Sequence, residues 1–223
     1  MGKTIEAIAC ANGHEVVYKK GSDFEDGILI EAHAAIEFST PEAAVSNIEM
    51  CLKNNIPVIS GTTGWLSRYA EMIKLCEIRN GSFIYASNFS VGVNLFFSIN
   101  EYAAKILAPW KEYTVAIEEI HHTQKKDAPS GTAISIAEGI IKNSDRNSWT
   151  METPSIESIG IEAKREGDVK GTHSVKYTSK IDTISLKHQA HTRDGFAKGA
   201  ILAAEWLVAK KGVYTMKDVL GIG

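Results

Sequence analysis

Short apolar strands alternate with helices from residue 34 to residue 86, and this alternation constrains the fold more than any other feature. Strands are predicted at 34–39, 57–60 and 82–86, with helices at about 41–54 and 66–79 between them. Such alternation builds a parallel sheet through right-handed crossovers, with helices on both faces. Ligands bind these sheets at the carboxyl ends of the strands. The loops there are Phe38-Ser39-Thr40, Gly61-Thr62-Thr63-Gly64 and Ser87-Asn88-Phe89-Ser90.

The chain starts directly at a predicted helix over 3–12, which Gly13 closes. A nucleotide-binding sheet usually starts with a strand whose Gly-x-Gly-x-x-Gly turn opens the first helix. Met1-Gly2 reads as the end of such a turn, so we expect the first strand and the first glycines to be absent. The alternative is a fold that simply begins with a helix. Loss of a central strand would expose two strand edges and remove amides that hold a pyrophosphate.

The organisation changes after residue 92. An apolar helix is predicted at about 94–108, a strand at 113–120 and a helix at 131–142. Three alternating stretches then predict antiparallel strands, at 155–161, 171–177 and 181–187. A helix over 194–210 and a short turn over 216–220 end the chain.

These patterns predict an α/β protein with two domains. The first is a parallel-sheet, nucleotide-binding domain over 1–92 and 197–223. The second is an α+β domain over 93–196 with a mixed or antiparallel sheet, inserted between the two parts of the first.

Composition excludes several classes of function. With 223 residues and a formal net charge of −3, the chain has no general attraction for nucleic acid or anionic membranes. No apolar run approaches the ~20 residues of a membrane span. The three cysteines, Cys10, Cys51 and Cys76, show no zinc-site spacing and favour a reducing, cytoplasmic compartment.

The densest group of polar residues is the 119–133 segment, Glu-Ile-His-His-Thr-Gln-Lys-Lys-Asp-Ala-Pro-Ser-Gly-Thr-Ala. His121 and His122 end a strand, where adjacent side chains point to opposite faces, so we expect different roles for them. Histidine titrates near neutrality and suits proton donation, and Lys125 adds a fixed positive charge. Ser130-Gly131-Thr132 opens a helix whose free amides and hydroxyls can accept an anion. The segment suits a carboxylate-bearing substrate that takes up a proton.

Other interpretations of these residues are open. A metal site from Glu119, His121 and His122 matches no common ligand spacing, and a serine nucleophile lacks the Gly-x-Ser-x-Gly elbow. Ser130 alone would be a helix cap. Arg193, at a helix entrance, is an anion ligand or a surface residue. His173 and His188 lie in predicted strands and are interpreted as core or strand-face residues.

At these residues the chain closely resembles the dihydrodipicolinate reductase family, also called 4-hydroxy-tetrahydrodipicolinate reductase, of lysine and diaminopimelate biosynthesis. The resemblance rests on the 119–133 segment. The loops 61–64 and 88–92 also match loops of the family and occur in the same order along the chain. The resemblance covers the whole chain except the absent first strand. It implies a Rossmann-like domain, a substrate-binding and tetramerisation domain, and the reduction of a cyclic unsaturated imine dicarboxylate to tetrahydrodipicolinate by NADPH or NADH.

The resemblance also implies roles for individual residues. His121 and Lys125 would donate protons. Substrate would be held by His122, Ser130, Gly131, Thr132 and Arg193. The cofactor would contact Gly2, Phe38, Gly61, Thr62, Thr63, Ser87, Asn88, Phe89 and Ser90, and no metal is implied. The expected assembly is a cytoplasmic homotetramer.

Two departures from the family pattern matter. The glycine loop survives only as Gly2, and Tyr18-Lys19-Lys20 stands where an acidic ribose ligand is expected, with Asp23 nearby. Lysines there can favour the 2′-phosphate of NADPH. The alternatives to an active reductase are an N-terminally truncated, catalytically weak homologue that still binds dicarboxylates, and a reductase of another two-domain family.

Overall fold

The computed structural model describes residues 1–222, and the chain divides into two compact units. Unit 1 comprises Met1–Val91 and Asp194–Gly223, and unit 2 comprises Gly92–Arg193. The two segments of unit 1 lie at opposite ends of the sequence, so unit 2 is an insertion in it.

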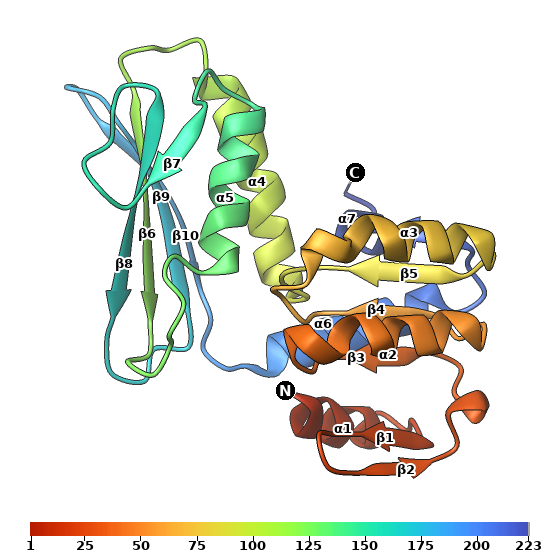
Figure 1. The fold of residues 1–223 in the computed structure, drawn as a ribbon. Helices are drawn as coiled ribbons and strands as arrows, with labels where there is room; N and C mark the ends of the chain where they lie inside the picture. Colours follow the sequence, from red (N-terminus) through yellow and green to blue (C-terminus); the bar gives the residue numbers. More distant parts are fainter. Residues whose placement is uncertain (223) are drawn as a thin grey trace. The chain divides into compact units, whose positions relative to one another are not determined.

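Unit 1 contains a four-stranded parallel sheet of order β11-β5-β4-β3 (Figure 1). Its strands are β3 (Ala35–Glu37), β4 (Val58–Ser60), β5 (Ser82–Tyr85) and β11 (Gly212–Tyr214). Its helical elements are α1 (Gly2–Ala11), η1 (Leu29–Glu31), α2 (Pro41–Lys53), η2 (Leu66–Arg68), α3 (Tyr69–Ile78), α6 (Asp194–Leu207) and α7 (Met216–Leu220). A separate antiparallel pair follows α1, formed by β1 (Tyr18–Lys20) and β2 (Glu25–Gly27).

Helices cover both faces of this sheet. On one face, Ile59 and Ile84 share a core with residues of α1, α6 and α7. On the other, Val58 and Phe83 share a core with α2 and α3. Val58 and Ile59 are adjacent on β4 and both fully buried, as expected for a strand packed on two sides. The predicted doubly covered parallel sheet is therefore confirmed.

Local sequence explains several helix boundaries. Pro41 occupies the first turn of α2, with Glu42 beside it and Lys53 in the last turn, so the charges complement the helix dipole. In α7, Thr215 and Asp218 form a capping box.

Unit 2 is a five-stranded mixed sheet of order β10-β9-β6-β8-β7, with two helices on one face (Figure 1). The helices are α4 (Val91–Leu107) and α5 (Gly131–Lys142). The strands are β6 (Thr114–His121), β7 (Ser148–Thr150), β8 (Ser158–Arg165), β9 (Thr172–Thr178) and β10 (Thr183–Gln189). Val115 and Ile117 of β6, with residues of β8 and β9, form one core with the helices.

The expectation that all three late strands are antiparallel was wrong for the first of them. β9 pairs antiparallel with β6 and β10, but β8 runs over Ser158–Arg165 and pairs parallel with β6. The chain returns from β6 to β8 through helix α5, and such a crossover brings strands back in the same direction. The short strands β2, β7 and β11 were not predicted.

Candidate active site

The functional residues of unit 2 gather where β6 ends. Along β6, Val115, Ile117, Glu119 and His121 alternate on the face that α4 and α5 cover, and all four are buried. The register places Glu119 opposite His173 of β9, and His121 opposite Arg165 of β8. Residues opposite each other in a sheet share a face, so the two neighbouring strands bring a second histidine and an arginine to β6.

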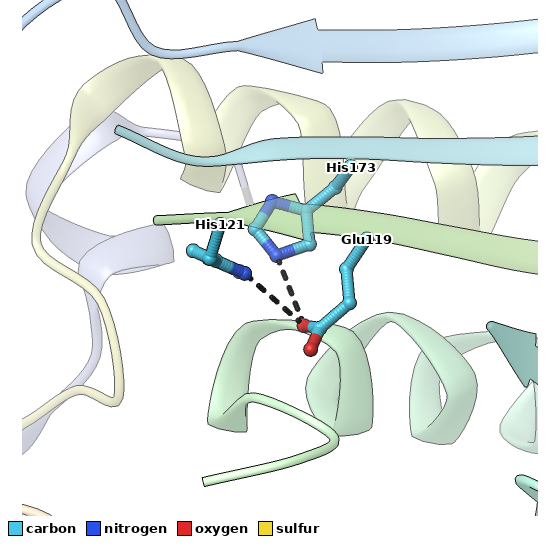
Figure 2. A group of neighbouring side chains, drawn as sticks. All are labelled: Glu119, His121 and His173. Carbon is cyan, nitrogen blue, oxygen red and sulfur yellow. Dashed lines mark ion pairs between the residues drawn. The ribbon is translucent and has the colours of Figure 1, made fainter. Parts of the chain in front are cut away.

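Glu119 is a fully buried carboxylate with several donors around it. Both of its oxygens accept from the amide of Ser130, at 3.1 and 3.2 Å, and Oε1 lies 3.1 Å from a guanidinium nitrogen of Arg165. Its Oε2 lies 3.7 Å from Nδ1 of His121 and 3.7 Å from Nε2 of His173 (Figure 2). Burial alone would raise the pKa of Glu119, but the neighbouring His173 imidazole and the Ser130 hydrogen bonds together lower it to about 2. The group is ionised at neutral pH.

His121 is held in its neutral form. Its side chain is 10% exposed, and burial is the main reason that its pKa falls to about 4. The charges of His173, Lys125 and Arg165 act in the same direction, whereas Glu119 opposes them. An anionic ligand beside the ring would favour the charged form, because it would offset these neighbouring positive charges.

Lys125 lies on the loop after β6, which Arg165 braces from β8. The ammonium of Lys125 lies 2.8 Å from both carboxylate oxygens of the exposed Asp127. Burial acts to raise the pKa of Asp127, but the Lys125 hydrogen bond outweighs it, so this pKa is lowered. The Arg165 guanidinium donates to the backbone carbonyls of Lys125 and Asp127. The loop is thereby fixed against the same arginine that pairs with Glu119.

Ser130 caps helix α5 and has partners of its own. Its Oγ accepts from the amide of Ala133 at 3.2 Å and lies 3.3 Å from Nε2 of His173. With its amide bonded to Glu119, this serine shapes the helix start. Gly131 differs, because no atom lies within 4 Å of the position that a Cβ would take. Thr132 follows and is buried. A ligand carboxylate can therefore approach the helix N-terminus most closely at Gly131.

A polar cavity of about 430 Å³ lies beside the loop after β6. Its lining includes His122 and Arg193, whose Nε2 and guanidinium lie 2.7 Å apart. Lys170, ion-paired with Asp168, adds a second cation that the sequence reading did not single out. Two cations, one carboxylate and a histidine suit an anionic ligand.

Glu119, His121 and His173 also satisfy the spacing for a metal site, with their ligand atoms within 4.8 Å of one another. The carboxylate is already committed to Arg165 and to the Ser130 amide. A divalent cation would have to enter beside a guanidinium, which Coulomb repulsion disfavours in a buried setting. The donor set thus fits a cluster of polar contacts better than a metal site. The alternative metal site weighed from the sequence included His122, but the residue that lies beside Glu119 and His121 is His173.

In unit 1, the three loops expected to contact a cofactor leave the same edge of the sheet. The register aligns Glu37, Ser60 and Tyr85 at the ends of three adjacent parallel strands. Just beyond, the Glu37 carboxylate accepts from Ser60 Oγ at 2.6 Å and from Thr62 Oγ1 at 2.9 Å. This buried carboxylate ties the end of β3 to the loop after β4.

The cofactor-loop residues are placed differently from one another. Thr62 is buried, and its Oγ1 also accepts from the Ser39 amide at 2.8 Å, whereas Thr63 is exposed. Phe89 is buried in the core, 5.8 Å from the ring of Phe38, so only its backbone faces a ligand. Asn88 accepts from the Ser90 amide at 2.9 Å, which shapes the loop that Ser87 begins. Among the residues expected to contact the cofactor on this edge, Thr63 is exposed, and Gly61, Ser87 and Ser90 are partly exposed.

Gly2 is exposed at the start of α1, a helix with no acidic residue in its first turn. A helix start of this kind suits a phosphate, because its amides and dipole favour an anion. Nearby, Lys19 is ion-paired with Glu6, so its charge is partly compensated. The features of unit 1 fit a dinucleotide: three small, polar loops on one edge of a parallel sheet and a helix start without acidic residues.

Sequence reasoning did not single out Arg165, interpreted His173 as a core or strand-face residue, and considered Glu119 only within the 119–133 motif and the alternative metal site. A signal existed for two of them. Glu119 continues the alternation of Val115 and Ile117, and His173 precedes Val175 and Tyr177 in the same alternation, so both fall on buried faces. A charged or titratable residue on a buried strand face is a functional candidate. Arg165 could not be found in this way, because its pairing with β6 depends on the parallel register.

Among residues 1–222, no helix is both long enough and apolar enough to cross a membrane.

Comparison with known proteins gives a consistent result. The model of the dihydrodipicolinate reductase N-terminus matches residues 1–89, and that of the C-terminus matches residues 92–220. The 4-hydroxy-tetrahydrodipicolinate reductase of Christiangramia forsetii is 49% identical over 223 residues, covering 99% of this chain and 93% of that protein. The Aquifex aeolicus enzyme of the same name is 42% identical over 202 residues, covering 87% of this chain and 76% of its own length.

Solved structures agree in fold. A dipicolinate-bound dihydrodipicolinate reductase from Paenisporosarcina sp. TG-14 superposes with a TM-score of 0.67 at 23% identity, covering 83% of this chain and 72% of that one. A probable dehydrogenase from Thermotoga maritima gives a TM-score of 0.59 at 10% identity. The match covers 99% of this chain and 83% of that one. On the two family models and the curated relatives, the chain belongs to the dihydrodipicolinate reductase family.

Proposed function

We propose that this chain catalyses the NAD(P)H-dependent reduction of 4-hydroxy-tetrahydrodipicolinate, or its dehydrated form dihydrodipicolinate, to tetrahydrodipicolinate in lysine and diaminopimelate biosynthesis. The observation that carries the proposal is the 119–133 segment within a chain that both family models match. That segment joins a buried histidine, a lysine and an open helix start, which are the groups that a dicarboxylate taking up a proton requires.

NADH or NADPH is the cofactor, and when bound it supplies a hydride. The loops at 38–40, 61–64 and 87–90 would hold it at the carboxyl edge of the parallel sheet, with Gly2 at the phosphates. The buried Glu37 carboxylate stabilises the loop after β4 by accepting hydrogen bonds from Ser60 and Thr62. Lys19 and Lys20 on β1 would lie on the side where a 2′-phosphate distinguishes the two nucleotides.

His121 and Lys125 are assigned the proton-donating role. A substrate that accepts a hydride becomes electron-rich, and an acid must quench that charge. Lys125 carries a positive charge and has an exposed partner, Asp127, that a substrate carboxylate can replace. His121 is neutral without ligand, and the negative charge of a dicarboxylate would favour its protonation.

The substrate carboxylates are assigned to two places in unit 2. One is the start of α5, where Gly131 and Thr132 offer backbone and hydroxyl groups and Ser130 holds the turn. The other is the polar cavity lined by His122 and Arg193. Cations near a dianion reduce the cost of removing it from water.

We also assign this chain to a cytoplasmic homotetramer that forms through unit 2. The supporting feature is the sheet face opposite α4 and α5, on which none of the described residues forms a covering helix (Figure 1). An open sheet face of this kind packs readily against another copy of itself.

The test follows NADH and NADPH oxidation with enzymatically generated dihydrodipicolinate. We expect oxidation that depends on this substrate, and none with a monocarboxylate analogue. The hypothesis of a weak, dicarboxylate-binding homologue predicts binding without turnover, so the same assay separates the two.

A role-specific prediction accompanies it. His121→Gln should lower kcat about 100-fold, the size of a general-acid contribution, while nucleotide affinity measured by fluorescence titration stays unchanged. Loss of nucleotide binding with turnover retained per bound nucleotide would contradict the proton-donor assignment.

A further inference from the structure

His121, the assigned proton donor, lies beside a carboxylate, Glu119, and a second imidazole, His173, neither of which has a role in the proposed reaction so far (Figure 2). Nδ1 of His121 is buried and has no hydrogen-bond partner among residues 1–222. The carboxylate oxygen Oε2 of Glu119 lies 3.7 Å from it. This separation is too long for a hydrogen bond, but a shift of well under 1 Å would close one. Contacts in ligand-free active sites often shorten in this way when substrate binds.

Glu119 is fixed firmly enough to orient a neighbour. The Ser130 amide and Arg165 hold its two oxygens, and Nε2 of His173 approaches the same oxygen, Oε2, that faces His121, also at 3.7 Å. The two imidazoles meet edge to face with ring centroids 5.0 Å apart. The carboxylate therefore has little freedom, and it is His121 that can move towards it.

We propose that Glu119 is a positioning residue that acts through His121: its carboxylate accepts the Nδ1–H of His121, stabilises the charged imidazole and leaves Nε2–H directed at the substrate. The inference rests on the proposed function. In the step itself, the Nε2–H bond breaks as a bond forms from that proton to an electron pair of the reduced substrate. His121 is left neutral, with its remaining proton on Nδ1 and held by Glu119.

The charges around His121 make this carboxylate decisive. The ring faces His173 from β9, Arg165 from β8 and Lys125 from the following loop, and each of these disfavours its protonation. Glu119, on its own strand β6, is the neighbouring group that favours protonation. Without the carboxylate, the imidazole would be charged only at a lower pH.

The test compares Glu119→Gln with the wild-type protein. Because Glu119→Gln leaves Arg165 without its buried partner, the double variant Glu119→Gln/Arg165→Gln is made as well. Glu118→Gln is the matched control, since Glu118 is the preceding carboxylate of β6 and pairs with Lys164 on the other face of the sheet. We expect both Glu119 variants to lose about 100-fold in kcat, with KM for the nucleotide unchanged and the alkaline limb of the pH profile, where the general acid loses its proton, moved to lower pH. Glu118→Gln should match wild type.

A second readout does not require turnover. With ¹⁵N-labelled histidine and dipicolinate as the probe, NMR should show His121 with a hydrogen-bonded Nδ1–H in the wild-type protein and not in Glu119→Gln. Identical His121 signals in both proteins would overturn the inference, as would a stoichiometric metal ion bound through His121 in the purified chain. A wild-type protein that lacks reductase activity but gives the expected signals would contradict the proposed function and support the Glu119 contact.

Discussion

At the scale of single residues, the site combines two basic side chains in different environments. Lys125 lies in a half-exposed ion pair with Asp127, whereas His121 is buried and its pKa is lowered to about 4. Burial is the main cause of this low pKa, so the folded protein excludes a proton that the unfolded chain binds. The site therefore reduces stability in mild acid.

That exclusion predicts a specific dependence of stability on pH. Below the ordinary histidine pKa of 6.5, the unfolded chain gains a proton that His121 in the folded state takes up only near pH 4, so the free energy of unfolding falls with pH. Between pH 6.5 and pH 4.5 this contribution is on the order of 1–3 kcal/mol. In His121→Gln, urea unfolding at several pH values should show a shallower decline in that window. The lowered pKa of His188 acts in the same direction and keeps some slope in both proteins.

The contributions of Glu119 and His121 to stability fall in different ranges of pH. The lowered pKa of Glu119 contributes stability that is present above its ordinary value of 4.5 and is lost as pH falls toward 2. Equal slopes for wild type and His121→Gln above pH 4.5 would contradict the assignment of a neutral, buried imidazole.

Residue-level prediction from the sequence reached part of this site. The 119–133 segment identified His121, Lys125 and the Ser130 cap, because their spacing is local: a strand end, a loop and a helix start. His173 and Arg165 lie more than forty positions after His121 in the sequence. They join the site only because their strands pair with β6. Local patterns carry no information on which strands become neighbours, so the donors around Glu119 were not foreseen.

At the scale of elements, helix α6 approaches the loop after β5 more closely than any side chain would allow. A Cβ on Gly199 would lie 1.8 Å from the carbonyl oxygen of Phe89. Because that neighbour is backbone, it cannot turn aside as a side chain would. The loop assigned to the cofactor is thus held in place by the absence of a side chain on the helix.

Gly199→Ala should therefore lower stability by about 1–3 kcal/mol, the usual cost of overpacking, and raise KM for the nucleotide. Gly195→Ala, in the same helix, is the control, since its Cβ would meet Ser90 at an ordinary 3.4 Å. Thermal unfolding and initial-rate kinetics of the two variants check the prediction. A Gly199→Ala protein as stable as Gly195→Ala, with unchanged nucleotide KM, would contradict the close approach.

The prediction of helices and strands succeeded where the signals lie within the element itself. The helices at 41–53 and 131–142 follow from proline and serine at their starts and from apolar periodicity, whereas the predicted short turn over 216–220 is the helix α7. The direction of β8 did not follow, because a strand has the same alternation whether its neighbour is parallel or antiparallel. The strands β2, β7 and β11 have three residues each, and none contains two adjacent aliphatic residues as the equally short, predicted β4 does.

At the scale of the whole molecule, the open face of the unit 2 sheet supports the proposed tetramer. Along β6, Val115 and Ile117 point into the core, so the exposed Ala116 between them lies on the opposite face. Ala116 is at the middle of the sheet, opposite Gly160 of β8 and Lys176 of β9. Ala116 is small, and beside it the Pro154 side chain packs over Gly160, 3.2 Å from where a Cβ would lie, so small apolar groups stand at the centre of this face, where a second sheet could pack.

Ala116→Glu should dissociate the assembly without unfolding the subunit. The new carboxylate lies opposite Lys176, a favourable cross-strand pair, so the single chain tolerates it, whereas a buried interface would have to desolvate it. Light scattering coupled to size-exclusion chromatography should show a tetramer for wild type and smaller species for Ala116→Glu, with unchanged circular dichroism. Ile78→Glu, at a residue of unit 1 that is 70% exposed, should remain tetrameric. If Ala116→Glu stayed tetrameric, or if wild type were a monomer, assembly through this face would be excluded, because a bulky charge at its centre is incompatible with sheet-to-sheet contact.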